Sequence, residues 1–162
     1  MTDFKTEKLI IFALRICLGW TFLYAASHQV FVAGWSVSGF LSHTKTFSWL
    51  FTPMAGPTIA PVLSFLVSYG HLLIGLSLIS GMMVRVSSIF GILLMVLYWM
   101  AHMEWPYIGD QNSFIVDFHI IYALALWLLI VKRAGHVAGL DAMAARMPMF
   151  NGNGLLKWSV EA

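Results

Sequence analysis

Charged side chains are scarce in this sequence: Lys, Arg, Asp and Glu together make up 10% of its 162 residues, against 60% hydrophobic residues. A soluble domain carries about 25% charged residues, so the composition excludes the soluble globular classes and indicates a protein embedded in a lipid bilayer. Cysteine is almost absent. The single Cys17 excludes an internal disulfide and any CxxC metal or thiol motif. The net charge of +2 is too small for a nucleic-acid-binding surface, so no nucleic-acid partner is expected.

Long apolar runs dominate the sequence instead. Runs at residues 9–32, 58–80, 84–103 and 114–131 are close to or above the ~20 helical residues that cross a hydrocarbon layer of ~30 Å. They predict one all-α domain over residues 1–162, an integral membrane four-helix bundle. Residues 33–57 are broken by Gly and Pro and rich in aromatic side chains, which predicts a long interfacial segment or one folded back over the bundle. The tail at 134–150 is expected to form a short amphipathic C-terminal helix.

Lysine and arginine gather at one end of the predicted bundle. With four spans, both termini and the short link after the second run share one side of the membrane. That side collects Lys5, Lys8, Arg15, Arg85, Lys132, Arg133, Arg146 and Lys157, whereas the other side has Lys45. Because Lys and Arg are retained on the cytoplasmic side, the expected orientation is N-in and C-in. The acidic residues Glu104, Asp110 and Asp117 then lie at the outer face.

Each predicted span carries a polar stripe with one histidine on it. Helix positions three and four apart share one side, and the stripes are Cys17, Thr21, Tyr24, His28 and Phe31; Ser64, Ser68, His71 and Gly75; Ser88, Gly91, Met95, Tyr98 and His102; and Ile115, His119, Tyr122 and Leu126. Lipid offers no hydrogen bonds, so we expect the stripes to face the bundle interior. At ~1.5 Å rise per residue, three of these histidines fall in the outer half of the bilayer and His71 near its midplane.

A cluster of histidines, tyrosines and an acid suits several kinds of chemistry. Neutral imidazole and a tyrosine hydroxyl can bind the carbonyl oxygens of a quinone and transfer protons as it is reduced. Two histidines on facing helices suit a b-type haem, and three histidines with Asp117 or Glu104 suit a transition metal. Of these three ligands, a quinone requires the fewest specific side chains, because it already resides in the bilayer and needs only an accessible pocket with a few polar contacts.

We therefore predict a quinone site. Its candidate residues are, as catalytic groups, His102, His119, Tyr98 and Tyr122, and, as cofactor-binding groups, His28, Tyr24, His71 and Asp117. No metal ligand is assigned. Haem b is the second cofactor considered. The alternative, that these side chains only join helices by hydrogen bonds, stays open.

Arg15 lies about two turns into the first apolar run. We expect its guanidinium to reach the cytoplasmic headgroups while its aliphatic stem stays in the lipid. A partner in the C-terminal tail, such as Asp141, is the alternative.

Three stretches of the sequence resemble motifs of the DoxX family. YGHLLIGLSLISGMMVRVSSIFG, at 69–91, is similar to the family's central signature, an apolar run rich in small residues that ends in Gly, two or three apolar residues and Arg. RICLGWTFLYAASHQVF, at 15–31, resembles the opening span, and GLDAMAARMP, at 139–148, resembles the closing Leu-Asp motif. The matching positions are Arg15, Gly70, Gly75, Gly81, Arg85 and Asp141. His71 differs from the glutamate of many members.

Within the family the sequence is most similar to the DoxD type, the large subunit of a membrane thiosulfate:quinone oxidoreductase. This resemblance implies a multi-pass subunit of a prokaryotic cytoplasmic (inner) membrane that passes electrons from thiosulfate or another small donor to quinone. It also implies a small partner subunit or a larger membrane complex. The alternatives are a non-catalytic scaffold or assembly subunit and a bundle that binds haem b.

Overall fold

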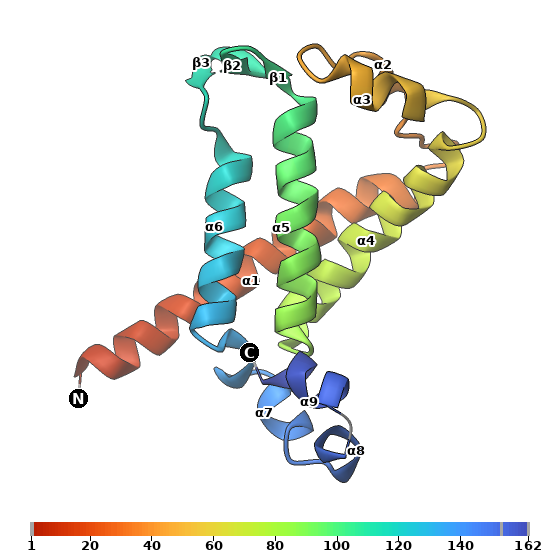
Figure 1. Ribbon diagram of the computed structural model, residues 1–162. Helices are drawn as coiled ribbons and strands as arrows, with labels where there is room; N and C mark the ends of the chain where they lie inside the picture. Colours follow the sequence, from red (N-terminus) through yellow and green to blue (C-terminus); the bar gives the residue numbers. More distant parts are fainter. Residues whose placement is uncertain (1, 153, 162) are drawn as a thin grey trace.

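The computed structural model describes residues 2–152 and 154–161 and is mostly helical (Figure 1). The body of the molecule consists of the apolar helices α1 (Thr2–Val30), α4 (Ala60–Ser80), α5 (Val84–Ala101) and α6 (Phe118–Val131). Three of them, α1, α4 and α5, are long and apolar enough to cross a membrane. The fourth, α6, has 14 residues and is therefore only about 21 Å long. The prediction of an all-α membrane protein is confirmed.

The last predicted span begins too early in the sequence. Asp117 caps α6, because its Oδ1 accepts the backbone N–H of His119 at 3.0 Å and so replaces a hydrogen bond that the first turn lacks. The residues before this cap belong to β3 (Asp110–Phe114), which forms a small antiparallel sheet with β1 (Met103–Glu104) and β2 (Tyr107–Ile108). The third span likewise ends at Ala101. Strands of two to five residues leave no periodic pattern, so the sheet was not predicted.

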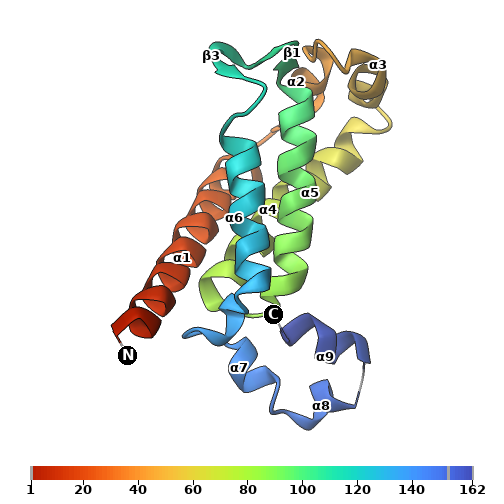
Figure 2. The same ribbon diagram turned by 60° about the vertical axis from the view of Figure 1, so that its left-hand side comes forward.

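The apolar helices pack in pairs. Helix α1 crosses α4 at an angle, and α5 runs beside α6 in both views (Figures 1 and 2). Gly75 allows the close approach of α1, since a Cβ at this position would meet the side chain and backbone of Leu23. Close contacts through small residues stabilise helix pairs in lipid, where burial of apolar surface contributes little. The largest fully buried apolar side chains include Phe22, Leu78, Leu126 and Leu129.

The polar stripes differ in where they face. Helix α4 buries its predicted stripe, which comprises Ser64, Ser68, His71 and Gly75. Helix α1 exposes its predicted stripe, which comprises Cys17, Thr21, Tyr24, His28 and Phe31. The buried side of α1 carries instead Ile11, Arg15, Leu18, Phe22 and Ala26. The prediction for α1 is therefore wrong, and the physical reason is local: Thr21 and His28 hydrogen-bond to carbonyls one turn earlier in the same helix and need no partner in the interior.

The segment between α1 and α4 folds back over the ends of the helices beside the small sheet, which we name the outer end for reference (Figure 1). It contains α2 (Ser38–Ser42), α3 (Ser48–Phe51) and the 3-10 helix η1 (Thr52–Ala55). Val37, Leu41 and Phe51 are buried against Ala101, at the end of α5. Of the two predictions for this segment, the fold-back describes it (Figure 1).

The C-terminal tail packs at the opposite end of the helices, which we name the inner end for reference (Figure 1). It contains the 3-10 helix η2 (Ala134–His136), α7 (Asp141–Ala144), α8 (Pro148–Asn151) and α9 (Gly154–Val160), in place of the single amphipathic helix predicted. Gly135, Gly139 and Pro148 interrupt the helical pattern. Arg85 and Arg133 hold the tail by donating to carbonyl oxygens at the end of α9, at 3.0 and 2.8 Å. The first turns of α1 and the helix α9 lie at this same end (Figure 2).

Candidate functional site

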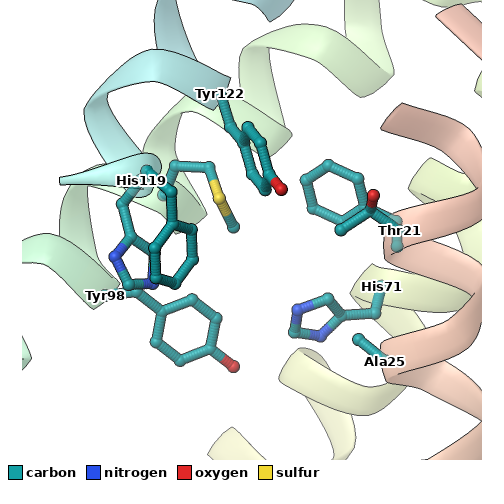
Figure 3. A pocket seen from close by; sticks show the side chains of 9 residues that line it. Thr21, Ala25, His71, Tyr98, His119 and Tyr122 are labelled. Carbon is teal, nitrogen blue, oxygen red and sulfur yellow. The ribbon is translucent and has the colours of Figure 1, made fainter. Parts of the chain in front are cut away.

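Side chains from α1, α4, α5 and α6 surround one small cavity, named here the membrane pocket (Figure 3). Its volume is about 150 Å³. An engineered apolar cavity of this size in another protein binds benzene, so the space suits one six-membered ring. The lining residues are Thr21, Phe22, Ala25, His71, Met95, Tyr98, Phe118, His119 and Tyr122. Thr21 and Phe118 are exposed, so the pocket has an edge on the exterior of the chain, where lipid would lie.

His71 enters the pocket from α4. Its ring is buried, and Nδ1 lies 2.8 Å from the carbonyl oxygen of Val67, one turn earlier. A carbonyl only accepts hydrogen bonds, so this contact assigns the proton of a neutral ring to Nδ1 and leaves Nε2 as the free acceptor. Figure 3 shows the ring edge of His71 pointing into the open space.

His119 lies in the first turn of α6 and points into the pocket. Asp117 holds it through two contacts, one to its backbone and one to its ring. Asp117 accepts the backbone N–H of His119 on one oxygen and contacts ring Nδ1 with the other, at 2.5 Å. Both side chains are buried. A carboxylate on Nδ1 orients the imidazole and stabilises its protonated form, so His119 is held ready to accept or donate a proton at Nε2.

Tyr98 lies between the two histidines. Its ring centroid is 5.8 Å from that of His71 and 5.9 Å from that of His119. On the same side of α1 as Phe22, the Gln29 Oε1 atom is buried without a hydrogen-bond partner. The hydroxyls of Tyr98 and Tyr122 both point toward the α1 side of the space (Figure 3). The pocket therefore presents several hydrogen-bonding groups within apolar walls.

His102 lies just outside the membrane pocket, at the C-terminal end of α5. Its ring stacks on that of His119, with centroids 5.1 Å apart and planes inclined by 27°. It lines a second cavity of about 280 Å³, named here the outer pocket, together with Gly39, Phe40, His43, Lys45, Ala101, Glu104 and Gly109. His102 is thus next to the site without lining it.

The structure brings most of the predicted site residues together. His71, Tyr98, His119 and Tyr122 line the membrane pocket, and Asp117 and His102 each contact His119. Tyr24 and His28 lie elsewhere, on the exposed side of α1, where their rings contact each other at 4.6 Å. Gln29 was missed, although its spacing from Phe22 and Arg15 places these three residues on one side of α1. In the part of the chain that the structure describes, no group of three metal-ligating side chains comes together, so the transition-metal alternative has no site there.

Arg15 is fully buried at the inner end. The prediction that its guanidinium extends to the lipid headgroups is therefore wrong. Its Nη1 and Nη2 donate to the carbonyl oxygens of Ala134 and Ala138 at 2.6 and 3.0 Å. These carbonyls follow α6 and are held against α1. These fixed carbonyl acceptors replace headgroups and water for Nη1 and Nη2, while Nε is buried without a hydrogen-bond partner.

Asp141 is also fully buried and ties the tail to the link between α4 and α5. Its two carboxylate oxygens accept the backbone N–H groups of Met83 and Val84 at 2.6 and 3.1 Å. Burial raises the pKa of Asp141, while these N–H groups and the nearby charges of His136 and Arg15 oppose the rise. A Cβ at Gly135 would overlap the Asp141 carboxylate. We name Arg15, Asp141 and the backbone groups that they bind the inner joint.

A comparison with family models gives a match to DoxX over residues 10–103, more than half of the chain. The chain belongs to the DoxX family. Neither the curated proteins nor the solved structures give a match. DoxX proteins are membrane proteins that are often linked to oxidoreductase or quinone-related functions.

The DoxX match covers only part of the membrane pocket and only part of the inner joint. It includes α1, α4 and α5, and therefore Arg15 of the inner joint and His71 and Tyr98 of the membrane pocket. Helix α6 with His119, and the tail with Asp141, lie beyond it. Of the six motif positions, Arg15 and Asp141 belong to the inner joint, and none of the six lines the membrane pocket.

Proposed function

We propose that this DoxX protein is the membrane subunit of a quinone-linked oxidoreductase and that the membrane pocket binds the quinone ring. The observation that supports this most directly is the arrangement of His71, Tyr98 and His119. Each histidine has Nδ1 engaged with a fixed acceptor, which leaves Nε2 available, and the tyrosine lies between the two rings.

The chemistry of a quinone matches these walls. A quinone is one flat six-membered ring with two carbonyl oxygens, and Phe22, Met95 and Phe118 supply the apolar contacts for such a ring. Tyrosine hydroxyls and protonated histidine nitrogens donate hydrogen bonds to the carbonyl oxygens. The exposed edge at Thr21 and Phe118 allows entry from the bilayer, where quinones reside.

Reduction of a quinone consumes two electrons and two protons. In this proposal the electrons come from thiosulfate or another small donor that a partner subunit binds at the outer face. Among the described Lys and Arg side chains, Lys45 is the one at that end, so the chain offers little to hold a dianion by itself. The protons pass through His119, whose imidazolium form Asp117 stabilises.

We propose further that α1, α4, α5 and α6 form a four-helix bundle in a prokaryotic inner membrane, with both termini cytoplasmic. The first turns of α1, the start of α5 and the end of α6 lie at the inner end (Figure 1). The basic residues at these positions, which are Lys5, Lys8, Arg85, Lys132 and Arg133, support this orientation. Helix α6 is about 21 Å long and falls short of a ~30 Å hydrocarbon layer.

A scaffold role is the second candidate, and one observation favours it: the motif residues Arg15 and Asp141 build a structural joint. A haem is supported less well. The membrane pocket holds about 150 Å³, whereas sites for drug-sized ligands hold about 300–1,000 Å³, and a porphyrin is larger than one quinone ring.

Binding of decylubiquinone to the purified protein in detergent tests the proposal. Tyr98→Phe and His119→Gln each remove one hydrogen bond, worth about 0.5–1.5 kcal/mol, so the Kd should rise about 2- to 12-fold. Tyr24→Phe and His28→Gln are matched controls on the exposed side of α1 and should leave Kd unchanged. Absence of binding by the wild-type protein, or equal effects of site and control substitutions, would refute the quinone site and favour the scaffold.

A further inference from the structure

The outer pocket opens at the end of the molecule that carries the small sheet. Polar side chains from three parts of the chain meet in it: His43 and Lys45 from the segment after α2, His102 from the end of α5, and Glu104 from β1. These four side chains are exposed. In the proposed membrane orientation, the pocket is in contact with water on the outer side.

His102 belongs to this outer pocket and also contacts the membrane pocket. One side of its ring stacks on His119, which lines the membrane pocket, and Phe40 packs against it with a centroid distance of 4.9 Å. Where these two rings stack, only the imidazoles of His102 and His119 lie between the two cavities. Tyr98, which lines the membrane pocket, also contacts the His102 ring, with centroids 6.3 Å apart.

The hydrogen bonds of the two rings leave the same nitrogen free in each. His102 Nδ1 lies 2.9 Å from the carbonyl oxygen of Tyr98, so a neutral ring carries its proton there, as His119 does toward Asp117. Each Nε2 is then available to accept a proton. The groups that face His102 are His119 and Tyr98 on the inner side and His43, Lys45 and Glu104 on the outer side.

We propose that His102 transfers protons between the outer pocket and His119, so that the membrane pocket exchanges protons with the outer surface. The proposal rests on the quinone function proposed above. His102 takes a proton from water in the outer pocket and passes it to His119, directly after a ring rotation or through one water molecule. His119 gives it to the quinone oxygen. One quinone, two electrons and two of these protons give one quinol, and both imidazoles return to their neutral forms.

His102 thus acts through His119 as a positioning and relay residue. Its loss should slow proton delivery without weakening quinone binding, because it does not line the membrane pocket. His28 provides a matched control. It is also exposed, it also engages Nδ1 with the carbonyl oxygen of a tyrosine four residues earlier, at 3.0 Å, and it lies at neither pocket.

The test uses the full chain in a lipid layer on an electrode, which supplies the electrons, with decylubiquinone as the probe. The rate of proton-coupled quinone reduction should fall on the order of 100-fold in His102→Ala and in the better-packed His102→Gln, a typical loss for a proton-transferring side chain. His28→Ala should match the wild type. Imidazole added to the solution should restore the rate of His102→Ala, because the outer pocket, at about 280 Å³, has room for it.

The outcomes separate the relay from the quinone site itself. Wild-type rates in both His102 variants would overturn the relay, and so would slow rates that imidazole does not restore, because the latter indicate a purely structural role. In each of these cases decylubiquinone still binds and the quinone site stands. If the wild-type protein does not bind decylubiquinone, the proposed function fails and the relay fails with it.

Discussion

Replacement of Arg15 by methionine tests whether the inner joint holds the helices together. The substitution keeps an unbranched side chain of similar length but removes two hydrogen bonds, to Ala134 and Ala138, and leaves Asp141 buried without its nearby positive charge. A hydrogen bond to a charged group contributes about 1.5–3 kcal/mol, and Arg15 makes two of them. We therefore expect Arg15→Met to lower the free energy of unfolding by about 3 kcal/mol or more.

The assay is unfolding in mixed micelles of mild detergent and SDS, followed by circular dichroism. Lys132→Met is the control, because Lys132 pairs with Glu7 at 2.6 Å on the surface and such pairs contribute about 0–1 kcal/mol. The double variant Arg15→Met with Asp141→Asn should lose less than the sum of the two single variants, by about 1–3 kcal/mol. Additive losses would show that the two residues act independently.

The pH dependence of the Arg15→Met variant gives a second measure of the same joint. Burial already raises the pKa of Asp141 from 3.8, and loss of Arg15 removes a charge that lowers it, so the pKa should rise further. An acid with a raised pKa in the folded state contributes stability below its unfolded pKa, and that contribution is lost as the pH rises through the folded value. The deficit of Arg15→Met should therefore shrink as the pH falls from about 7 to about 4. A loss below about 1 kcal/mol, or a deficit independent of pH, would refute the reasoning.

Three further predictions concern single positions and the purified protein. Gly139→Ala should destabilise by about 1–3 kcal/mol in the same micelle assay, because its Cβ would overlap Arg15 and backbone, whereas Gly70→Ala meets nothing within 4 Å and should not destabilise. Asp117→Asn should keep the cap of α6, since Asn caps helices as well as Asp does, but should slow quinone reduction at the electrode by changing the ring proton of His119; an unchanged rate would contradict that role. Purified wild-type protein should contain extractable quinone and show no Soret absorbance, and a Soret band would favour haem instead.

The sequence predicted the helices better than their ends. Apolar runs predicted both ends of α4 and α5, and the end of α1, to within two residues, because a helix that crosses lipid needs about 20 apolar residues. Helix α1 begins seven residues before the predicted span, at Thr2 instead of residue 9. The start of α6 depended on Asp117, a single cap within an apolar run. The small sheet and the broken tail depend on contacts with distant segments, such as Asp141 with Met83 and Val84, which a local pattern does not contain.

Helical periodicity also predicted which residues share a side, but not which side is buried. On α4 this made no difference, because the polar and small residues lie on one side, which is buried. On α1 two sides carry polar groups, and we predicted that the side with Tyr24 and His28 faces the bundle interior. The buried side carries Arg15 and Gln29, whose charged and amide groups are the costliest to leave in lipid.

The sequence by itself determined that this is a membrane protein of apolar helices, and that several histidines and tyrosines lie toward one end of them. Both follow from composition and from the 3.6-residue period, which are local properties. Only the tertiary structure decided that His71, Tyr98 and His119 share a pocket, that His102 lies between it and the outer pocket, and that Arg15 is buried. These depend on how each helix is rotated against its neighbours, and side-chain packing between distant segments sets that rotation.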